Sequence, residues 1–161
     1  MKKHMLFTLL VVLPFPMIAR AGTVCPWINK ATVSGLLDSM VSLEMQSADG
    51  NGSTCFFQSR NQSSPLSLQV VVRNRDAGHE IVGYESQCGS YREPLRNIAN
   101  DTVLCDIEAH SLRGVQVTGR VRNKIFAVRL ESSRRENAGM TEKMLREKAK
   151  TAAEQVAGNL F

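Results

Sequence analysis

The chain has 161 residues, of which 43% are hydrophobic and 22% are charged, and its formal net charge is +5. This length suits one ordinary domain. Three of the 20 basic residues lie in the first 21 positions, so the remainder has 17 basic and 15 acidic residues and a net charge of +2. So small an excess argues against a nucleic-acid partner.

The first 21 residues have the layout of a secretory signal peptide. A basic start precedes an apolar stretch over residues 5–18, and Ala19-Arg20-Ala21 is a small-x-small cleavage site. The apolar stretch is short and contains two prolines, and no later stretch reaches the roughly 18 apolar residues of a membrane span. We predict a bacterial protein that is secreted or periplasmic, with residues 22–161 as its single domain and no integral membrane segment after cleavage.

The four cysteines all follow residue 21: Cys25, Cys55, Cys88 and Cys105. An even number in an exported chain favours two disulfides. A metal site is not expected, because no C-x-x-C pair is present, and no cofactor is expected either. Four cysteines allow three connectivities, and the sequence does not choose among them. We prefer Cys25–Cys55 with Cys88–Cys105 because sequential pairing closes the two shorter loops.

The first half of the chain predicts one helix followed by strands. Asn29 can cap a short helix over residues 30–39. A weak strand over 43–47 is followed by strands over 53–60 and 66–73. The last of these alternates leucine and valine with polar residues, which is typical of a strand that buries one face.

The second half predicts, in order, a helix over 76–88, an irregular connection over 90–100, strands over 102–110, 114–121 and 125–131, and a helix over 141–160. Strands 114–121 and 125–131 form a hairpin. The final helix carries an apolar stripe from Met144 to Leu160. This order favours an α+β domain in which amphipathic helices cover an antiparallel sheet and a long helix ends the chain.

Residues 25–32 read CPWINKAT and resemble the C-P-W-L-N-x-A-T start of a group of small bacterial secreted proteins. Residues 94–100, 119–126 and 152–157 resemble that group's connection before a strand, its hairpin and its last helix. The architecture is similar to the PsbP-like fold and to mycobacterial LpqN-type lipoproteins. Two features depart from the pattern: Ala99 and Asn100 replace the usual glycine and acid, and a lipobox is absent. The resemblance implies a PsbP-like sandwich and an exported location, but no reaction.

No catalytic signature is present: the sequence lacks a G-x-S-x-G elbow, a Walker loop, a G-x-G-x-x-G loop and an H-E-x-x-H motif. His79, which precedes Glu80, and His110 are the only histidines after residue 21. A general base also needs a nucleophile and an orienting group placed in space. We therefore predict that the protein is not an enzyme, with a small hydrolase built around either histidine as a less favoured alternative.

Five basic residues crowd the predicted hairpin: Arg113, Arg120, Arg122, Lys124 and Arg129. They could form a patch for an anionic partner such as lipid headgroups, acidic glycans or an acidic protein. They could equally be the solvated charges that protect a sheet face or edge, which is the interpretation we favour.

Taken together, the sequence predicts a monomeric, non-catalytic binding or assembly module of the cell envelope. Its partner would be an unknown protein or envelope ligand, and not nucleic acid. The alternative is a structural envelope protein that binds anionic polymers or lipids through the basic hairpin.

Overall fold

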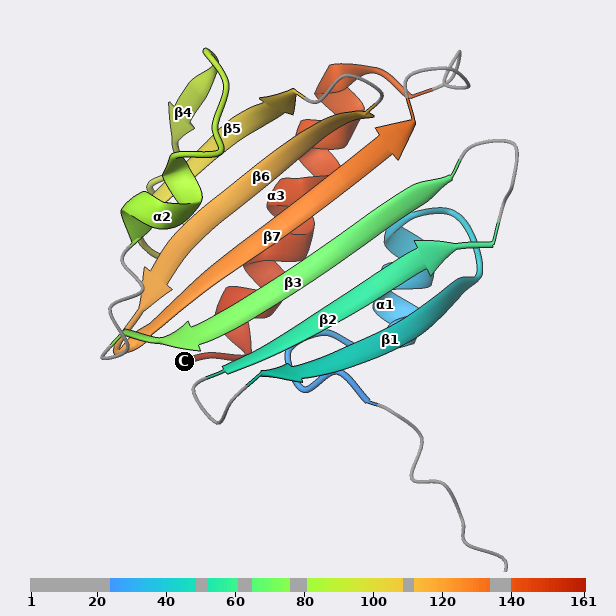
Figure 1. Cartoon of the computed structure of the whole chain (residues 1–161), viewed down its shortest axis with the longest axis horizontal. Helices are drawn as coiled ribbons and strands as arrows, with labels where there is room; N and C mark the ends of the chain where they lie inside the picture. Colours follow the sequence, from blue (N-terminus) through green and yellow to red (C-terminus); the bar gives the residue numbers. More distant parts are fainter. Residues whose placement is uncertain (1–23, 49–51, 61–64, 76–80, 109–111, 134–139) are drawn as a thin grey trace, which may run out of the picture.

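The computed structural model of the chain describes residues 24–48, 52–60, 65–75, 81–108, 112–133 and 140–161. Its centre is a seven-stranded antiparallel sheet in the order β1-β2-β3-β7-β6-β5-β4 (Figure 1). The strands are β1 (Val41–Ala48), β2 (Gly52–Ser59), β3 (Leu66–Asn74), β4 (Arg92–Pro94), β5 (Asn100–Glu108), β6 (Leu112–Val121) and β7 (Lys124–Ser133). The helices are α1 (Lys30–Leu36), α2 (Ile81–Glu85) and α3 (Glu142–Gly158). The predicted α+β fold with a long C-terminal helix is confirmed.

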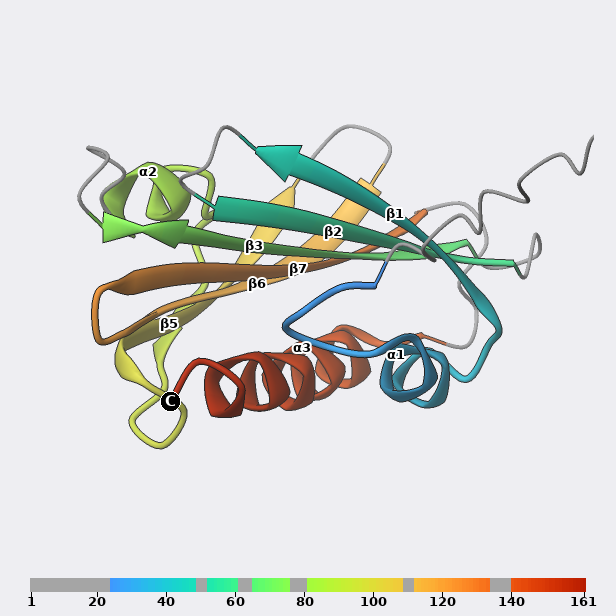
Figure 2. The same ribbon diagram turned by 90° about the horizontal axis from the view of Figure 1, so that it is seen from below.

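Helices lie on both faces of the sheet, but unequally. Helices α1 and α3 lie side by side under one face, which we call the helix face, and the short helix α2 lies on the opposite face (Figure 2). We call that opposite face the outer face. The long helix packs on β6 and β7, while α1 packs against β1, β2 and α3. No helix among the described residues is long and apolar enough to cross a membrane.

The core lies between the helix face and α3. Leu145 and Val156 of α3 are almost fully buried, together with the small residues Ala149, Ala152, Ala153 and Ala157. The alanines let the helix approach the sheet closely. Thr141 caps α3 by accepting a hydrogen bond from the Met144 backbone N–H at 3.2 Å. The predicted stripe is correct except at its start, because the Met144 side chain is 42% exposed.

Strand alternation sorts the side chains between the two faces as the sequence predicts. On β3, the apolar side chains of Leu66, Leu68, Val70 and Val72 are buried on the helix face. The intervening residues, from Ser67 to Arg73, therefore lie on the outer face. The β6–β7 hairpin likewise places Val117 opposite Val128 on the helix face.

Two details of the strands differ from the predictions. The hairpin turn contains only Arg122 and Asn123, since Lys124 already pairs with Val121. Arg122 has a φ of 53°, and a positive φ at this position is what the turn of a two-residue hairpin requires. The predicted irregular connection over 90–100 contains β4, whose three residues pair with β5. An edge strand this short, with two charged residues and Pro94, has no apolar alternation that sequence analysis could detect.

Both disulfides have the preferred connectivity. Cys25 bonds to Cys55 with a Cα–Cα distance of 5.8 Å, and Cys88 bonds to Cys105 with a Cα–Cα distance of 5.4 Å. The first bond ties the N-terminal segment to β2 inside the core. The second ties the segment after α2 to β5 on the outer face. The prediction of two disulfides is confirmed, and no cysteine is free.

Gly119 is a packing position where only glycine fits. A Cβ atom there would lie 2.7 Å from Cζ of Phe126 and 2.8 Å from Oγ1 of Thr102. We expect Gly119→Ala to lower the free energy of unfolding by about 1–3 kcal/mol. Gly35→Ala in α1 is the matched control, because a Cβ there meets nothing within 4 Å. It should be neutral or stabilise by up to about 1 kcal/mol. Urea unfolding measures both, and equal effects would contradict this packing.

Candidate functional site

Helix α2 is fixed at one corner of the outer face by three attachments. Gln116 Nε2 of β6 donates a hydrogen bond to the Tyr84 carbonyl at 2.8 Å. Arg92 Nη2 of β4 donates to the Glu85 carbonyl at 3.2 Å. The Cys88–Cys105 disulfide is the third attachment. Of the described helices only α2 lies on this face (Figures 1 and 2). A hollow lies beside it, lined also by residues of β2, β3 and β7.

The hollow beside α2, which we call the outer hollow, has a volume of about 270 Å³. It is lined by side chains from three strands and from the α2 segment: Thr54, Gln69, Val71, Arg73, Tyr84, Gln87, Ala127 and Arg129. Its floor is apolar, and its walls are hydroxyls, amides and guanidinium groups. Such a lining can orient a polar ligand over a small apolar surface.

The register of β3 against β7 explains why these residues meet. Gln69 pairs with Arg129, and Val71 pairs with Ala127. Arg73 lies four residues beyond Gln69 on β3, which separates the two arginines by about 14 Å along the strands at ~3.4 Å per residue. Val71 and Ala127 are small, so they form a depression between the two longer arginine side chains.

Arg129 is held in place by two described neighbours. Glu131 Oε1 lies 2.6 Å from Arg129 Nε. Gln87 Oε1 accepts a hydrogen bond from Arg129 Nη1 at 3.2 Å. A guanidinium carries five N–H donors, so this arrangement orients the group and leaves it capacity for a further acceptor.

A second hollow, which we call the terminal hollow, lies further along the same two strands. Its volume is about 220 Å³, and it is lined by Arg75, Ile81, Val82, Asp101, Arg120 and Ile125. Arg120 Nη2 forms an ion pair of 2.6 Å with Asp101. Ile125 and Ala127 are successive outer-face positions of β7, and Arg75 directly follows the last residue of β3, two positions after Arg73. The two hollows are therefore neighbours on one strip of the sheet.

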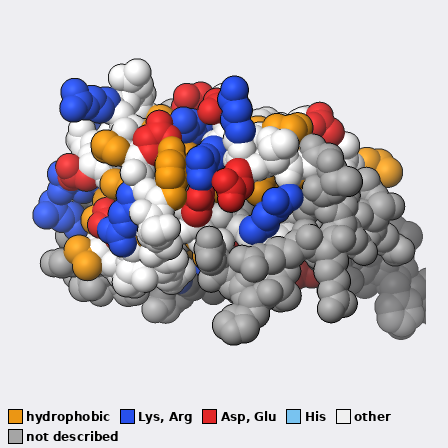
Figure 3. Space-filling model, turned by 90° about the horizontal axis from the view of Figure 1, so that it is seen from above, with side chains coloured by type: hydrophobic (Ala, Val, Ile, Leu, Met, Phe, Trp, Pro, Cys, Tyr) orange, Lys and Arg blue, Asp and Glu red, His pale blue; other side chains and the backbone are white. Residues whose placement is uncertain are grey.

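A charge network joins the β4–β5 edge to α3 on the helix face. Arg146 donates to both carboxylate oxygens of Asp106, at 3.1 and 2.5 Å, and its guanidinium lies 3.6 Å from the centroid of the Tyr91 ring. Tyr91 donates to Glu93 at 3.0 Å, and Lys150 donates to the same carboxylate at 3.2 Å. The view onto this edge shows acidic and basic side chains interleaved (Figure 3). Interleaved charges of this kind protect a sheet edge.

The network shifts the pKa values of its members in the directions that hold it together. The hydrogen bond from Tyr91, followed by Lys150, lowers the pKa of the Glu93 carboxyl, and the same hydrogen bond raises the pKa of the Tyr91 phenol. Asp106 raises the pKa of the Arg146 guanidinium. Partial burial lowers the pKa of the Lys150 ammonium, but Glu93 and Glu147 together outweigh it, so this pKa is raised overall.

Acid should weaken this network through Glu93. Its folded-state pKa is lower than its unfolded value near 4.5, so its stabilising contribution is present above that pH and is lost as the pH falls through the folded pKa. We expect Glu93→Gln to destabilise the protein at pH 7 and to reduce the loss of stability between pH 5 and pH 3. Urea unfolding at both pH values measures this, with Glu154→Gln on the exposed side of α3 as the control. The same acid dependence in Glu93→Gln and the unmodified protein would contradict the role of this carboxyl.

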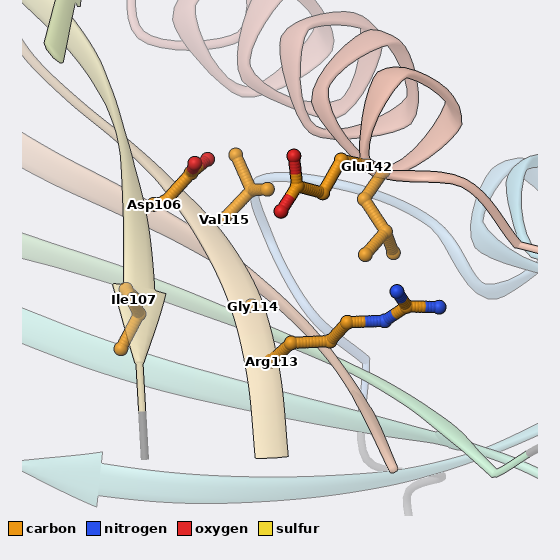
Figure 4. Close-up of a pocket in the computed structure, with 7 residues that line it drawn as sticks. Asp106, Ile107, Arg113, Gly114, Val115 and Glu142 are labelled. Atoms are coloured by element: carbon orange, nitrogen blue, oxygen red, sulfur yellow. The ribbon is translucent and has the colours of Figure 1, made fainter. Parts of the chain in front are cut away.

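A larger hollow of about 360 Å³ lies on the helix side, between the ends of β5 and β6 and the start of α3. The carboxylates of Asp106 and Glu142 lie on either side of Val115, and Arg113 extends past Gly114 (Figure 4). Asp106 is bound by Arg146, and Glu142 Oε2 lies 3.5 Å from Arg146 Nη2. Arg113 donates to the Met140 carbonyl at 2.7 Å. Each of these charged groups already has a partner, so the hollow offers fewer uncommitted polar groups than its size suggests.

The predicted basic hairpin is divided between the two faces of the sheet. Arg113 and Lys124 lie on the helix face, since they alternate in step with Val115 and Phe126. Lys124 lies 5.7 Å from the centroid of the Trp27 ring and donates to Asn74. Arg120 and Arg129 lie on the outer face, each beside a carboxylate, and Arg122 is exposed in the turn.

Sequence analysis missed the partners that β3 contributes to the outer face. Gln69 and Arg73 belong to a strand that was predicted correctly, and its alternation assigns both to the face opposite Leu68 and Val70. What the sequence does not show is the pairing of β3 with β7, which joins residues that are 50 or more positions apart in the chain. The histidines of the alternative hydrolase hypothesis, His79 and His110, lie outside the described residues.

Comparison with known proteins does not assign this chain to a family. No protein-family model matches the chain, and no curated protein matches its sequence. Within the described segments, no group of three or more His, Cys, Asp or Glu side chains is arranged to hold a metal ion. The geometry of the hollows is therefore the basis from which we infer a function.

Proposed function

We propose that the protein is an exported, non-catalytic binding or assembly module of the cell envelope, and that its ligand binds on the outer face of the sheet beside α2. The observation that carries this proposal is the outer hollow. It combines two arginines, two amides and two hydroxyl-bearing side chains over an apolar floor. Three strands and a disulfide-anchored segment hold this lining in place.

Several features of the chain support an exported binding module. The signal-peptide layout of residues 1–21 and the two disulfides fit an oxidising compartment. The resemblance of residues 25–32 to small secreted bacterial proteins points the same way. Among the described residues, the lining of the outer hollow contains no serine, cysteine, histidine or carboxylate. These described side chains supply groups that bind a ligand, and they include no paired nucleophile and base.

Site-specific photo-crosslinking to isolated cell envelopes tests this proposal. A photoreactive residue at Gln69 stands in the outer hollow, whereas the same residue at Glu154 stands on the exposed side of α3. We expect an adduct with an envelope component at position 69 and none at position 154. The crosslink should be competed by the unlabelled protein, and the captured component should be chemically unchanged.

Equal crosslinking at both positions, or none at position 69, would contradict an outer-face binding surface. A chemically altered component would contradict the non-catalytic assignment. A crosslink confined to the hairpin turn at Arg122 would instead favour the alternative of a protein that binds anionic polymers through its basic hairpin.

A further inference from the structure

We propose that α2 is a redox-controlled cover of the outer face: a dithiol reduces the Cys88–Cys105 disulfide, and the segment over residues 81–88 then leaves the sheet. This inference rests on the proposed function, because the released segment carries part of the lining of the outer hollow. Three observations carry it: the packing of α2, the residues of the sheet beneath it, and the different burial of the two disulfides.

Helix α2 contributes no side chain to the hydrophobic core. None of its residues, Ile81–Glu85, is buried, and none of the residues from Ser86 to Cys88 is buried either. Helix α3 on the other side of the sheet buries Leu145, Val156 and four alanines (Figure 2). A segment with few buried apolar contacts opens at a lower cost in free energy than the core. The two hydrogen bonds and the disulfide described above are therefore the main attachments of α2.

The part of the sheet that α2 covers includes two polar residues that water can solvate. Gln116 and Thr118 of β6 lie on the outer face and are each 2% exposed. Gln116 Nε2 donates to the Tyr84 carbonyl at 2.8 Å and to Thr118 Oγ1 at 3.1 Å. When α2 leaves, water can take the place of the Tyr84 carbonyl, so no buried polar group remains unpaired. Release of α2 therefore does not require the sheet to unfold.

The two disulfides differ in their accessibility to a reductant. Cys25 and Cys55 are 4% and 0% exposed, and both belong to the hydrophobic core. Cys88 is only half-buried, although its partner Cys105 is 1% exposed. Thiol–disulfide exchange requires a thiolate to approach one sulfur atom directly, so the rate depends on access. A reductant can therefore reach Cys88 while the fold protects the Cys25–Cys55 bond.

The reaction is a thiol–disulfide exchange in which a dithiol is the two-electron reductant. One thiolate of the dithiol attacks Cys88 Sγ, the S–S bond breaks, and Cys105 leaves as a thiolate. The second thiolate of the dithiol attacks the mixed disulfide, which releases Cys88 as a thiolate and leaves the dithiol as a cyclic disulfide. The two protons of the dithiol end on Cys88 and Cys105. The protein gains the two electrons and two protons that the dithiol loses.

A backbone hydrogen bond limits the extent of the released segment. The Gly89 N–H donates to the Asp106 carbonyl of β5 at 2.7 Å. This bond ties the chain to the sheet directly after Cys88, and the pairing of β4 with β5 holds the residues that follow. The moving part therefore ends at Cys88. It carries Tyr84 and Gln87, so its departure removes one wall of the outer hollow.

Graded reduction of the purified protein with dithiothreitol tests whether one bond is reduced selectively. Free thiols are alkylated with iodoacetamide after each interval, and peptide mapping identifies the labelled residues. We expect Cys88 and Cys105 to be alkylated about tenfold or more faster than Cys25 and Cys55, because the latter pair lies in the core.

Hydrogen exchange tests whether α2 then leaves the sheet. It is measured at the dithiothreitol concentration that reduces the outer bond alone. The amides of Ser86, Gln87 and Cys88 are hydrogen-bonded within the α2 segment in the oxidised protein. We expect them to exchange about tenfold or more faster after reduction, whereas the amides of α3 should be unchanged.

A matched pair of variants gives the released state without a reductant. Cys88→Ala with Cys105→Ala should show the same fast exchange over residues 86–88, and its crosslink to cell envelopes at position 69 should fall about threefold or more. Ser90→Ala is the control, because this exposed position lies beyond the Gly89 anchor, and it should change neither quantity.

Each outcome bears on one part of the inference. Equal rates of alkylation at all four cysteines would overturn the selective reduction, and unchanged exchange over residues 86–88 would overturn the release of α2. Loss of the α3 protection together with that of α2 would overturn the separation of α2 from the core. An unchanged crosslink at position 69 after release would overturn the control of the outer hollow. If the oxidised protein gives no crosslink at position 69, the proposed function fails, while the alkylation and exchange results still decide whether reduction releases α2.

Discussion

Deletion of residues 142–161 is expected to unfold the whole domain. The sheet would lose the cover of its helix face, where α3 buries Leu145, Val156 and four alanines. Burial of one leucine or valine side chain is worth about 1.5–3 kcal/mol, and a domain of this size is stable by only about 5–15 kcal/mol. The deletion would also expose the apolar side chains of β6 and β7 that now face the helix.

Circular dichroism and thermal unfolding measure this effect, and a matched pair of point variants refines it. Val156→Asp places a charge at a fully buried position, whereas Gln155→Asp places the same charge at the neighbouring exposed position. We expect Val156→Asp to lower stability by several kcal/mol. Gln155→Asp should have an effect of under about 1 kcal/mol. A truncated protein that unfolds cooperatively near the original temperature would show that α3 is an exposed arm.

Removal of the two disulfides is expected to have different consequences for stability and for binding. In the chain-entropy model each bond stabilises the protein by about 3–4 kcal/mol, with slightly more for the longer loop. The bonds span 30 and 17 residues, so Cys25→Ala with Cys55→Ala should be the more damaging pair. Cys55 is also fully buried, so its replacement disturbs the core.

Replacement of Cys88 and Cys105 should act on the outer face as well. This bond anchors the segment that supplies Tyr84 and Gln87 to the outer hollow. We therefore expect the second pair of variants to lose binding while still folded, whereas the first pair loses stability and keeps its binding residues in place. Urea unfolding measures the loss of stability, and the yield of the crosslink at position 69 measures the loss of binding. A full crosslink yield without the Cys88–Cys105 bond would show that α2 takes no part in binding.

Those parts of the fold that local periodicity encodes were predictable from the sequence. The alternation on β3, the hairpin of β6 and β7 and the stripe of α3 each show within a single segment which residues face the core. The disulfide pairing was preferred from loop length alone, and it holds because each bond joins elements that the sheet brings together. Strand β4 escaped detection because its stability comes from pairing with β5 and not from its own residues.

The candidate site could be predicted only in part, because it depends on pairing between distant segments. Arg120 and Arg129 are recognisable in the sequence as basic residues of the hairpin. Gln69 and Arg73, which line the outer hollow with Arg129, come from β3, and no pattern in the sequence places β3 beside β7. Side chains along a strand alternate between the two faces of the sheet, and this alternation also divides the basic residues between the helix face and the outer face. Arg113 and Lys124 alternate with buried apolar residues, and so they lie on the opposite face from Arg120 and Arg129.

The most direct test of the central claim is a map of backbone amide chemical shifts during titration with a detergent-solubilised extract of cell envelopes. We expect the largest changes over residues 69–73, 84–87 and 127–129, which surround the outer hollow. Residues 145–157 of α3, on the opposite face, should remain unperturbed. Changes centred on Asp106 and Glu142 around the helix-side hollow, or on the turn at Arg122, would contradict the assignment of the outer face as the binding surface.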